Sequence, residues 1–99
     1  MNYQDIEPYR KDLIKIIFHH FPSCQIYLFG SRATQTNNPH SDIDLAIDCG
    51  HVIPLHDLSA LIEAIDGLNI PFYVDIVDVR NTSPVMVEQI NKCGILWKQ

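Results

Sequence analysis

Residues 42–48, which read DIDLAID, alternate strictly between apolar and mainly acidic side chains. This period of two is that of a β-strand, in which successive side chains point to opposite faces of the sheet. One face would carry Ile43, Leu45 and Ile47 into a core. The segment therefore predicts a strand whose other face holds Asp42, Asp44, Ala46 and Asp48.

The remaining segments alternate between helix-type and strand-type patterns. Apolar residues at three- and four-residue spacing, or a Ser-Pro start, predict helices over 8–21, 54–67 and 83–94. Apolar, β-rich runs predict strands over 24–29, 72–79 and 95–97, the last of them at a sheet edge. A short helix is expected to begin within 31–36. This order predicts an α/β (α+β) fold in which helices pack on a small mixed sheet.

Length and charge limit the classes of protein that fit. The 99 residues suffice for one domain, so we expect a single unit over residues 1–99. Seven Lys and Arg against twelve Asp and Glu give a net charge of −5. This balance argues against a protein that follows a nucleic-acid backbone by bulk electrostatics, but it is compatible with a small anionic ligand carried by metal ions.

The sequence shows neither a membrane span nor a secretory signal. No apolar stretch approaches the roughly 20 residues that a span requires, and residues 1–5 lack the basic start of a signal peptide. Cys24, Cys49 and Cys93 are odd in number and far apart in the sequence, which argues against a disulfide framework or a zinc site. We therefore expect a cytoplasmic protein whose cysteines are reduced and packed in its core.

Asp42 and Asp44 are candidate metal ligands because they lie two residues apart on one face of the predicted strand. That spacing separates their Cα atoms by roughly 6.5–7 Å, so their oxygens can converge. Like charges this close raise each other's pKa unless a cation lies between them, and Mg²⁺ prefers carboxylate oxygen. The alternative is a solvent-facing strand edge, on which alternating acids are common.

A turn at Gly30 precedes the acidic strand and is a candidate phosphate site. The apolar pair Leu28–Phe29 leads into Gly30, Ser31 and Arg32. A glycine lets the backbone approach a phosphate, the first amides of a following helix point toward an anion, and Ser31 adds a hydroxyl donor. The alternative is an ordinary strand-to-helix turn in which Ser31 caps the helix.

Asp75 stands within the apolar run 74–77, where an ionised carboxylate without a partner would be costly. Its expected partner is either a metal ion shared with the two acids of the earlier strand, or one of the arginines Arg32 and Arg80. Asp78 falls on the opposite face of the predicted strand, near its exit, and we expect it to be solvated.

The chain resembles the polymerase-beta-like nucleotidyltransferase superfamily in a two-part motif, GSRAT at 30–34 and SDIDL at 41–45, followed by Asp75. Within that superfamily it is similar to the minimal nucleotidyltransferases (MNT), which are encoded beside HEPN-domain partners as toxin–antitoxin pairs. The resemblance covers nearly the whole chain. It implies the polymerase-beta-like core as the fold.

The resemblance implies a transferase that binds ATP with two Mg²⁺ ions, moves AMP to an acceptor hydroxyl and releases pyrophosphate. It assigns the catalytic and metal-binding role to the three acids Asp42, Asp44 and Asp75. The last of these would also help to deprotonate the acceptor. Nucleotide binding falls to Gly30 and Ser31, which would hold the β and γ phosphates, and to Arg32, which would contact phosphate or a partner.

The resemblance also suggests the acceptor. Larger relatives carry a further domain that holds the acceptor, and 99 residues cover only the catalytic core. We therefore expect the acceptor to be a hydroxyl, such as that of a tyrosine, on a partner HEPN toxin in a hetero-oligomeric complex. One alternative is a catalytically silent MNT-fold binding module that covers the toxin's active site, and another is transfer to RNA ends or a small molecule.

One departure from the family pattern lies in the loop after the Arg-Ala pair. Many relatives place a glycine there, whereas this chain has Thr34-Gln35-Thr36 and no glycine before Pro39. A loop without glycine has fewer accessible backbone conformations. We therefore expect a stiffer loop beside an intact set of acids.

Overall fold

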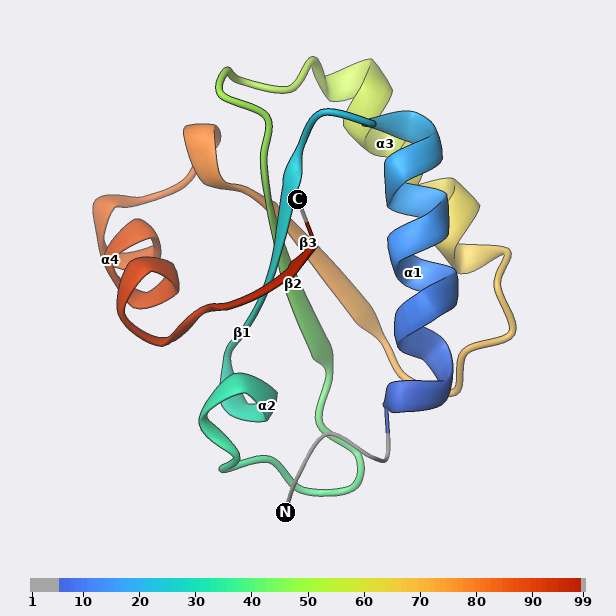
Figure 1. Cartoon of the computed structure of the whole chain (residues 1–99), viewed down its shortest axis with the longest axis vertical. Coiled ribbons are helices and arrows are strands. Elements are labelled where there is room, and N and C mark those ends of the chain that lie inside the picture. Colours follow the sequence, from blue (N-terminus) through green and yellow to red (C-terminus); the bar gives the residue numbers. More distant parts are fainter. Residues whose placement is uncertain (1–5, 99) are drawn as a thin grey trace.

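Four strands form a mixed sheet in the order β3-β2-β1-β4 (Figure 1). In the computed structural model, which describes residues 6–98, they are β1 (Gln25–Phe29), β2 (Ile43–Asp48), β3 (Val74–Asp78) and β4 (Ile95–Lys98). β1 pairs antiparallel with β2 and β4, whereas β2 and β3 run parallel. The predicted small mixed sheet is confirmed. Residues 1–5, to which the prediction of a missing secretory signal refers, lie outside the described part.

Helices cover both faces of this sheet (Figure 1). α1 (Glu7–His20) and α3 (Leu55–Asp66) lie side by side against one face, and α4 (Pro84–Cys93) lies against the other. The short helix α2 (Ser31–Thr34) follows β1, and the 3₁₀ turn η1 (Val79–Asn81) follows β3. The helices expected from the sequence patterns are all present.

The helix boundaries follow local signals in the sequence. Pro8 lies in the first turn of α1, where its missing N–H removes no intrahelical hydrogen bond. α4 starts after Ser83, whose hydroxyl accepts a 3.1 Å hydrogen bond from the Met86 amide and so satisfies one donor of the first turn.

Among the described residues, no helix combines the length and the apolar character that crossing a membrane requires.

The alternation along β2 divides the protein into two cores. Ile43, Leu45 and Ile47 are fully buried on the face that packs against α1 and α3. On the opposite face, Ala46 is buried in a smaller cluster with Phe29 of β1 and Ile90 of α4. The acidic end of the strand, at Asp44, lies two residues before Ala46 on the same face and is not part of this cluster.

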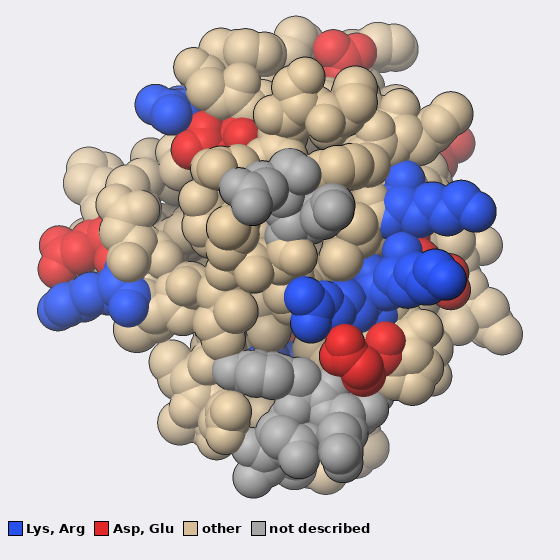
Figure 2. Space-filling model, viewed as in Figure 1, with Lys and Arg blue, Asp and Glu red and all other residues tan. Residues whose placement is uncertain are grey.

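Charged side chains of both signs share the surface seen in Figure 2. Lys and Arg side chains gather over α1, whose sequence includes Arg10, Lys11 and Lys15. Acidic groups lie beside them, and Arg10 forms a 3.4 Å ion pair with Glu7 on the same helix. The basic charge on this face is therefore locally offset by acidic groups.

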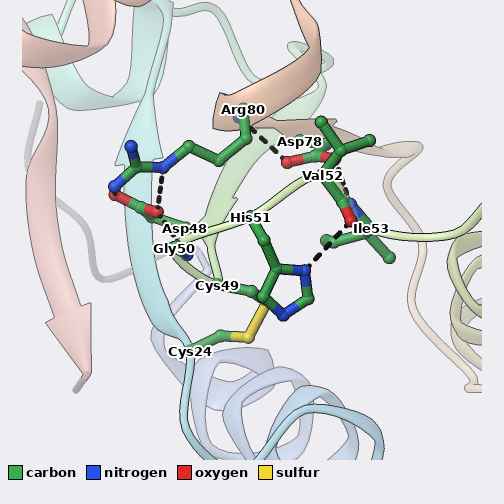
Figure 3. The surroundings of a disulfide bond; sticks show 9 residues. All are labelled: Cys24, Asp48, Cys49, Gly50, His51, Val52, Ile53, Asp78 and Arg80. Carbon is green, nitrogen blue, oxygen red and sulfur yellow. Dashed lines mark hydrogen bonds and ion pairs between the residues drawn. A yellow bond between two sulfur atoms is a disulfide. The ribbon is translucent and has the colours of Figure 1, made fainter.

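The prediction of reduced core cysteines is wrong for two of the three, because Cys24 and Cys49 form a disulfide (Figure 3). The antiparallel register of β1 and β2 pairs Gln25 with Asp48. Cys24 precedes Gln25 and Cys49 follows Asp48, so the two cysteines lie opposite each other just beyond this pair. Their Cα atoms are 4.3 Å apart. The sequence separation of 25 residues concealed this contact because it arises only from strand pairing. Cys93 on α4 is a free thiol, as predicted, but it is half-buried and not part of either core.

Reduction of this disulfide should lower the free energy of unfolding by about 3 kcal/mol, because the cross-link restricts a long loop of the unfolded chain. Urea unfolding with and without dithiothreitol measures the difference. Cys93→Ala is the matched control, and its response to the reductant should equal that of the wild type. Equal urea midpoints of the wild type in both conditions would show that the Cys24–Cys49 bond does not contribute in solution.

Candidate active site

The pairing of β2 with β3 brings two of the predicted acids together. The parallel register places Asp44 directly beside Asp75, and Asp42 lies immediately before β2. Asp42 and Asp75 are exposed, whereas Asp44 is half-buried. All three acids therefore belong to the end of the sheet that the cluster around Ala46 leaves open, and the charges of Asp42 and Asp75 both act on Asp44.

The environment of Asp44 makes ionisation of its carboxyl unfavourable. Burial and the neighbouring charges of Asp75 and Asp42 raise its pKa from 3.8 to about 6, against a smaller lowering effect of the Arg32 charge. Such a shift is expected where a carboxyl is partly buried beside like charges without a cation. It marks this corner of the sheet as a place where positive charge is favoured.

This pKa shift predicts a pH dependence of stability for the metal-free protein. Folding raises the pKa of Asp44, so ionisation of this carboxyl lowers the free energy of unfolding. This loss of stability is absent below pH 3.8, grows between pH 3.8 and about 6, and reaches its full size above pH 6. The variant Asp44→Asn lacks this penalty. Its stability advantage over the wild type should therefore grow with pH across this window, as measured by urea unfolding in EDTA. A difference that stays constant from pH 4 to 7 contradicts the shift.

Asp48 provides the control for this measurement because its pKa changes in the opposite direction. Its carboxylate accepts hydrogen bonds from Arg80 Nε (2.8 Å) and Nη2 (3.3 Å), which lower its pKa (Figure 3). Ionised Asp48 therefore stabilises the folded protein above its ordinary pKa, and this contribution is lost as the pH falls. Asp48→Asn should be less stable than the wild type at neutral pH and should approach it in acid.

The donor set fits a hard divalent cation such as Mg²⁺. The three acids offer only carboxylate oxygens, and a cation would offset the burial and the repulsion that together raise the pKa of Asp44. Within residues 6–98, no three His, Cys, Asp or Glu side chains lie close enough together to hold an ion unaided. Mg²⁺ is commonly bound by one or two carboxylates together with water and substrate phosphates. The site therefore suits a Mg²⁺ ion that shares its ligands with a nucleotide.

The turn at Gly30 adjoins these acids. Gly30 has φ +75° and ψ −158°, a conformation available in practice only to glycine, and its carbonyl accepts the first hydrogen bonds of α2. A methyl group in place of its hydrogen would overlap the Asp44 carboxylate oxygen Oδ2 and lie 3.1 Å from Cγ. Ser31 follows at the partly exposed start of α2. The predicted phosphate turn and the predicted metal ligand are thus in contact.

The loop after α2 adopts the conformation that a glycine would favour. Gln35 has φ +61° and ψ +33°, in the left-handed region, at the C-terminus of α2. Its amide and that of Thr36 both donate to the Ser31 carbonyl, which ends the helix. The missing glycine noted in the sequence therefore leaves the backbone path of this turn available, at the expense of local strain on Gln35.

Gln35→Gly should stabilise the protein by roughly 0.5–1 kcal/mol, because the relief of left-handed strain slightly exceeds the added entropy of an unfolded glycine. Thermal or urea unfolding measures the change. The matched control is Thr34→Gly, one residue earlier and within α2, which should destabilise. A loss of stability in Gln35→Gly would show that the Gln35 side chain contributes more than its backbone conformation costs.

Arg32 does not point into solvent from this turn. Only 2% of its surface is exposed, and its Nε and Nη2 atoms donate to the Ser41 carbonyl at 3.1 and 2.8 Å. Its guanidinium carbon lies 4.6 Å from the centre of the Phe72 ring. Neither Ser41 nor Phe72 was singled out as a site residue from the sequence, because a carbonyl oxygen and an aromatic ring in an apolar run carry no distinctive sequence signal.

Two assumptions about the third strand are wrong, namely that Asp75 is buried and that Asp78 is solvated, whereas the metal ion considered as a partner of Asp75 stays a prediction. Asp75 is exposed, so no buried partner is required, and Arg80 pairs with Asp48 instead. Asp78 is only 5% exposed, and its carboxylate accepts hydrogen bonds from the amides of Ile53 (2.8 Å) and Arg80 (2.9 Å), as Figure 3 shows. β3 lies at the sheet edge, which opens the Asp75 end to solvent, while the loop after β2 folds over Asp78.

Comparison with known proteins places this geometry in a family. A sequence profile described as "Polymerase beta, Nucleotidyltransferase" matches residues 11–98. The curated protein adenylyltransferase MntA of Shewanella oneidensis is 36% identical over an alignment of 91 positions, which covers 86% of this chain and 62% of that protein. The chain thus spans less than two thirds of the length of this relative.

Two solved structures share the fold. One is a toxin–antitoxin complex with AMP-PNP, with a TM-score of 0.77, 28% identity and coverage of 90% of this chain and 72% of that chain. The other is tri-AMPylated Shewanella oneidensis HEPN toxin in complex with MNT antitoxin, with a TM-score of 0.65, 26% identity and coverage of 93% and 71%. The α/β fold predicted from the sequence is the fold of these chains.

Proposed function

The chain belongs to the polymerase beta nucleotidyltransferase family, and from this premise we propose that it is a protein adenylyltransferase that moves AMP from ATP to a hydroxyl of a partner HEPN toxin and thereby acts as its antitoxin. The observation that carries the proposal is the direct pairing of Asp44 with Asp75 beside the Gly30 turn. A protein that served only as a binding surface would have no use for like charges held at neighbouring strand positions.

Each residue of this corner has a role in the proposed reaction. Asp42, Asp44 and Asp75 would hold Mg²⁺, which supplies charge neutralisation of the triphosphate and activation of the acceptor oxygen. Asp75, which is exposed on the edge strand β3, would receive or relay the proton of the acceptor hydroxyl. Gly30 and Ser31 would bind the β and γ phosphates and orient pyrophosphate as the leaving group.

The identity of the nucleotide and the acceptor comes from the relatives. The protein with 36% identity is named a protein adenylyltransferase, and one similar structure contains AMP-PNP. Another similar structure pairs an MNT antitoxin with a HEPN toxin that carries AMP. ATP as the donor and a HEPN-domain protein as the acceptor are accordingly our proposal for this chain. The modified residue that we propose is a tyrosine, as the sequence resemblance suggests.

Intact mass spectrometry tests this function. A HEPN-domain protein encoded beside this one is incubated with the chain, ATP and Mg²⁺, and with the double variant Asp42→Ala/Asp44→Ala as the control. We expect one or more AMP units on the partner, located on tyrosine by peptide mapping, and none with the variant. No mass gain on a partner that forms a tight complex would favour the silent binding module instead.

A further inference from the structure

Arg32 occupies an unusual position for a cation near a phosphate site. Its side chain is almost fully buried, although an ionised guanidinium is costly to remove from water unless its donors are satisfied. Two of those donors converge on a single main-chain oxygen, that of Ser41, and the planar group stacks on Phe72. Such a fork-like contact depends on the shape of the guanidinium and not only on its charge.

The first contact fixes the chain just before Asp42. Ser41 is the residue preceding Asp42, so its carbonyl belongs to the same peptide unit as the Asp42 amide. Ser41 is itself tied to Asn38, because its amide donates to the Asn38 carbonyl (3.1 Å) and its hydroxyl accepts from the Asn38 amide (3.0 Å). Arg32 therefore fastens an otherwise irregular loop at the point where it delivers Asp42.

The second contact reaches the strand that carries Asp75. Phe72 lies three residues before Asp75, and the carbonyl of the intervening Tyr73 accepts a 2.9 Å hydrogen bond from the Ile43 amide, which extends the pairing of β2 and β3. A ring held against the guanidinium limits how this end of β3 can move relative to α2. Arg32 is thus in contact with the segments that lead into both exposed acids.

We propose that Arg32 is a positioning residue, which sets the spacing of Asp42 and Asp75 relative to the Gly30 turn through its contacts with Ser41 and Phe72, and that it does not bind the triphosphate. This role rests on the proposed function, because it presumes that the acids hold Mg²⁺ with a nucleotide. It replaces the phosphate contact expected from the sequence, for which a buried side chain is poorly placed.

The test compares Arg32→Lys and Arg32→Met with the wild type in AMP transfer to the HEPN partner, at varied Mg²⁺ and varied ATP. A positioning role predicts that both variants raise the Mg²⁺ concentration at half-maximal rate by about 10–100-fold, lower kcat and leave the KM for ATP largely unchanged. A phosphate contact predicts that Arg32→Met mainly raises the KM for ATP and that the point charge of Arg32→Lys restores it. That second pattern would overturn the proposal.

Arg80→Met is the matched control, because it removes the same charge from an exposed arginine at the opposite end of the sheet. The Mg²⁺ dependence of Arg80→Met should equal that of the wild type. A shift as large as that of Arg32→Met would show that net charge alone explains the effect and would overturn the proposal. Hydrogen exchange of the amides of residues 41–44 gives a second readout, which should accelerate in both Arg32 variants relative to the amides of β1.

The readouts separate this inference from the proposed function. If the wild type transfers no AMP, the proposed function fails, while hydrogen exchange and the stabilisation of the protein by Mg²⁺ still report on Arg32. Faster exchange at residues 41–44 and weaker stabilisation by Mg²⁺ in both variants support the positioning role in that case. If the wild type transfers AMP and both variants keep its Mg²⁺ dependence, the positioning role fails and the proposed function stands.

Discussion

Asp44→Asn should lower AMP transfer by about a thousandfold or more, which corresponds to about 4 kcal/mol of transition-state stabilisation. Asp44 pairs with Asp75, follows Asp42 by two residues and contacts the Gly30 turn, so its carboxylate is central to any cation held at this corner. An amide keeps the size of the group but loses its charge and one acceptor. The variant should therefore fold and still be unable to hold Mg²⁺ effectively.

The same substitution should make the metal-free protein more stable at neutral pH. The pKa of Asp44 is raised to about 6, so its ionised form is disfavoured in the folded state, and the neutral amide removes that penalty. Loss of activity together with gain of stability is the pattern expected of a group arranged for a ligand and not for the fold. Initial rates of AMP transfer and urea unfolding in EDTA measure the two effects on one preparation.

Asp48→Asn is the matched control for this prediction. Asp48 lies on the same strand and the same face, on the far side of Ala46, and pairs with the exposed Arg80. Its substitution should change AMP transfer by less than about threefold and cost at most about 1 kcal/mol of stability, as for other exposed ion pairs. The expected loss of AMP transfer in Asp44→Asn is about a thousandfold or more. A loss of less than about tenfold would show that Asp44 is not a catalytic residue.

Much of the fold follows from local patterns. The alternation in β2 alone fixes which side chains enter the main core, because a shift by one residue would place Ile43, Leu45 and Ile47 outside it. The helix starts marked by Pro8 and Ser83 are equally local, since they depend on neighbouring backbone groups. These elements could be read from the sequence because their cause lies within a few residues.

The parts that the sequence did not predict depend on contacts between distant segments. Cys24 meets Cys49 only because β1 and β2 pair in one register. Asp78 is buried because the loop after β2 reaches it with the Ile53 amide. Arg32 is buried because a carbonyl and a ring from two other segments surround it. In each case the residue type was visible in the sequence, but its partner was not.

The candidate site shows both situations. The motif and the strand period placed Asp42 and Asp44 on one face, and parallel pairing then added Asp75 beside them. The motif could not show that the phosphate turn and the acids are in direct contact. The Asp44 carboxylate occupies the space that a side chain at Gly30 would need. That contact makes Gly30 the second position at which a large effect is expected.

Gly30→Ala should destabilise the protein by about 4 kcal/mol and lower AMP transfer by about a hundredfold or more. A non-glycine residue at φ +75° and ψ −158° costs of order 1–3 kcal/mol, and forcing a methyl group into an occupied space costs typically a further 1–3 kcal/mol. The overlap is with the carboxylate of Asp44, so relief requires Asp44 to leave its place beside Asp75. A displacement of about 1 Å in such a site is enough for a hundredfold loss of rate.

Gly50→Ala separates the two causes. Gly50 also has a positive φ, +78°, but a methyl group there would meet no atom within 4 Å. The control should therefore show the backbone strain alone, with a stability loss of about 1–2 kcal/mol and unchanged AMP transfer below its melting temperature. If Gly30→Ala behaves like Gly50→Ala in both measurements, Asp44 can move aside without consequence, and the close contact between the turn and the acid is not part of the site. The expected result is a loss of AMP transfer in Gly30→Ala alone that does not recover when the assay temperature is lowered. Such a loss would show that the displaced Asp44, and not the reduced stability of the fold, causes the defect.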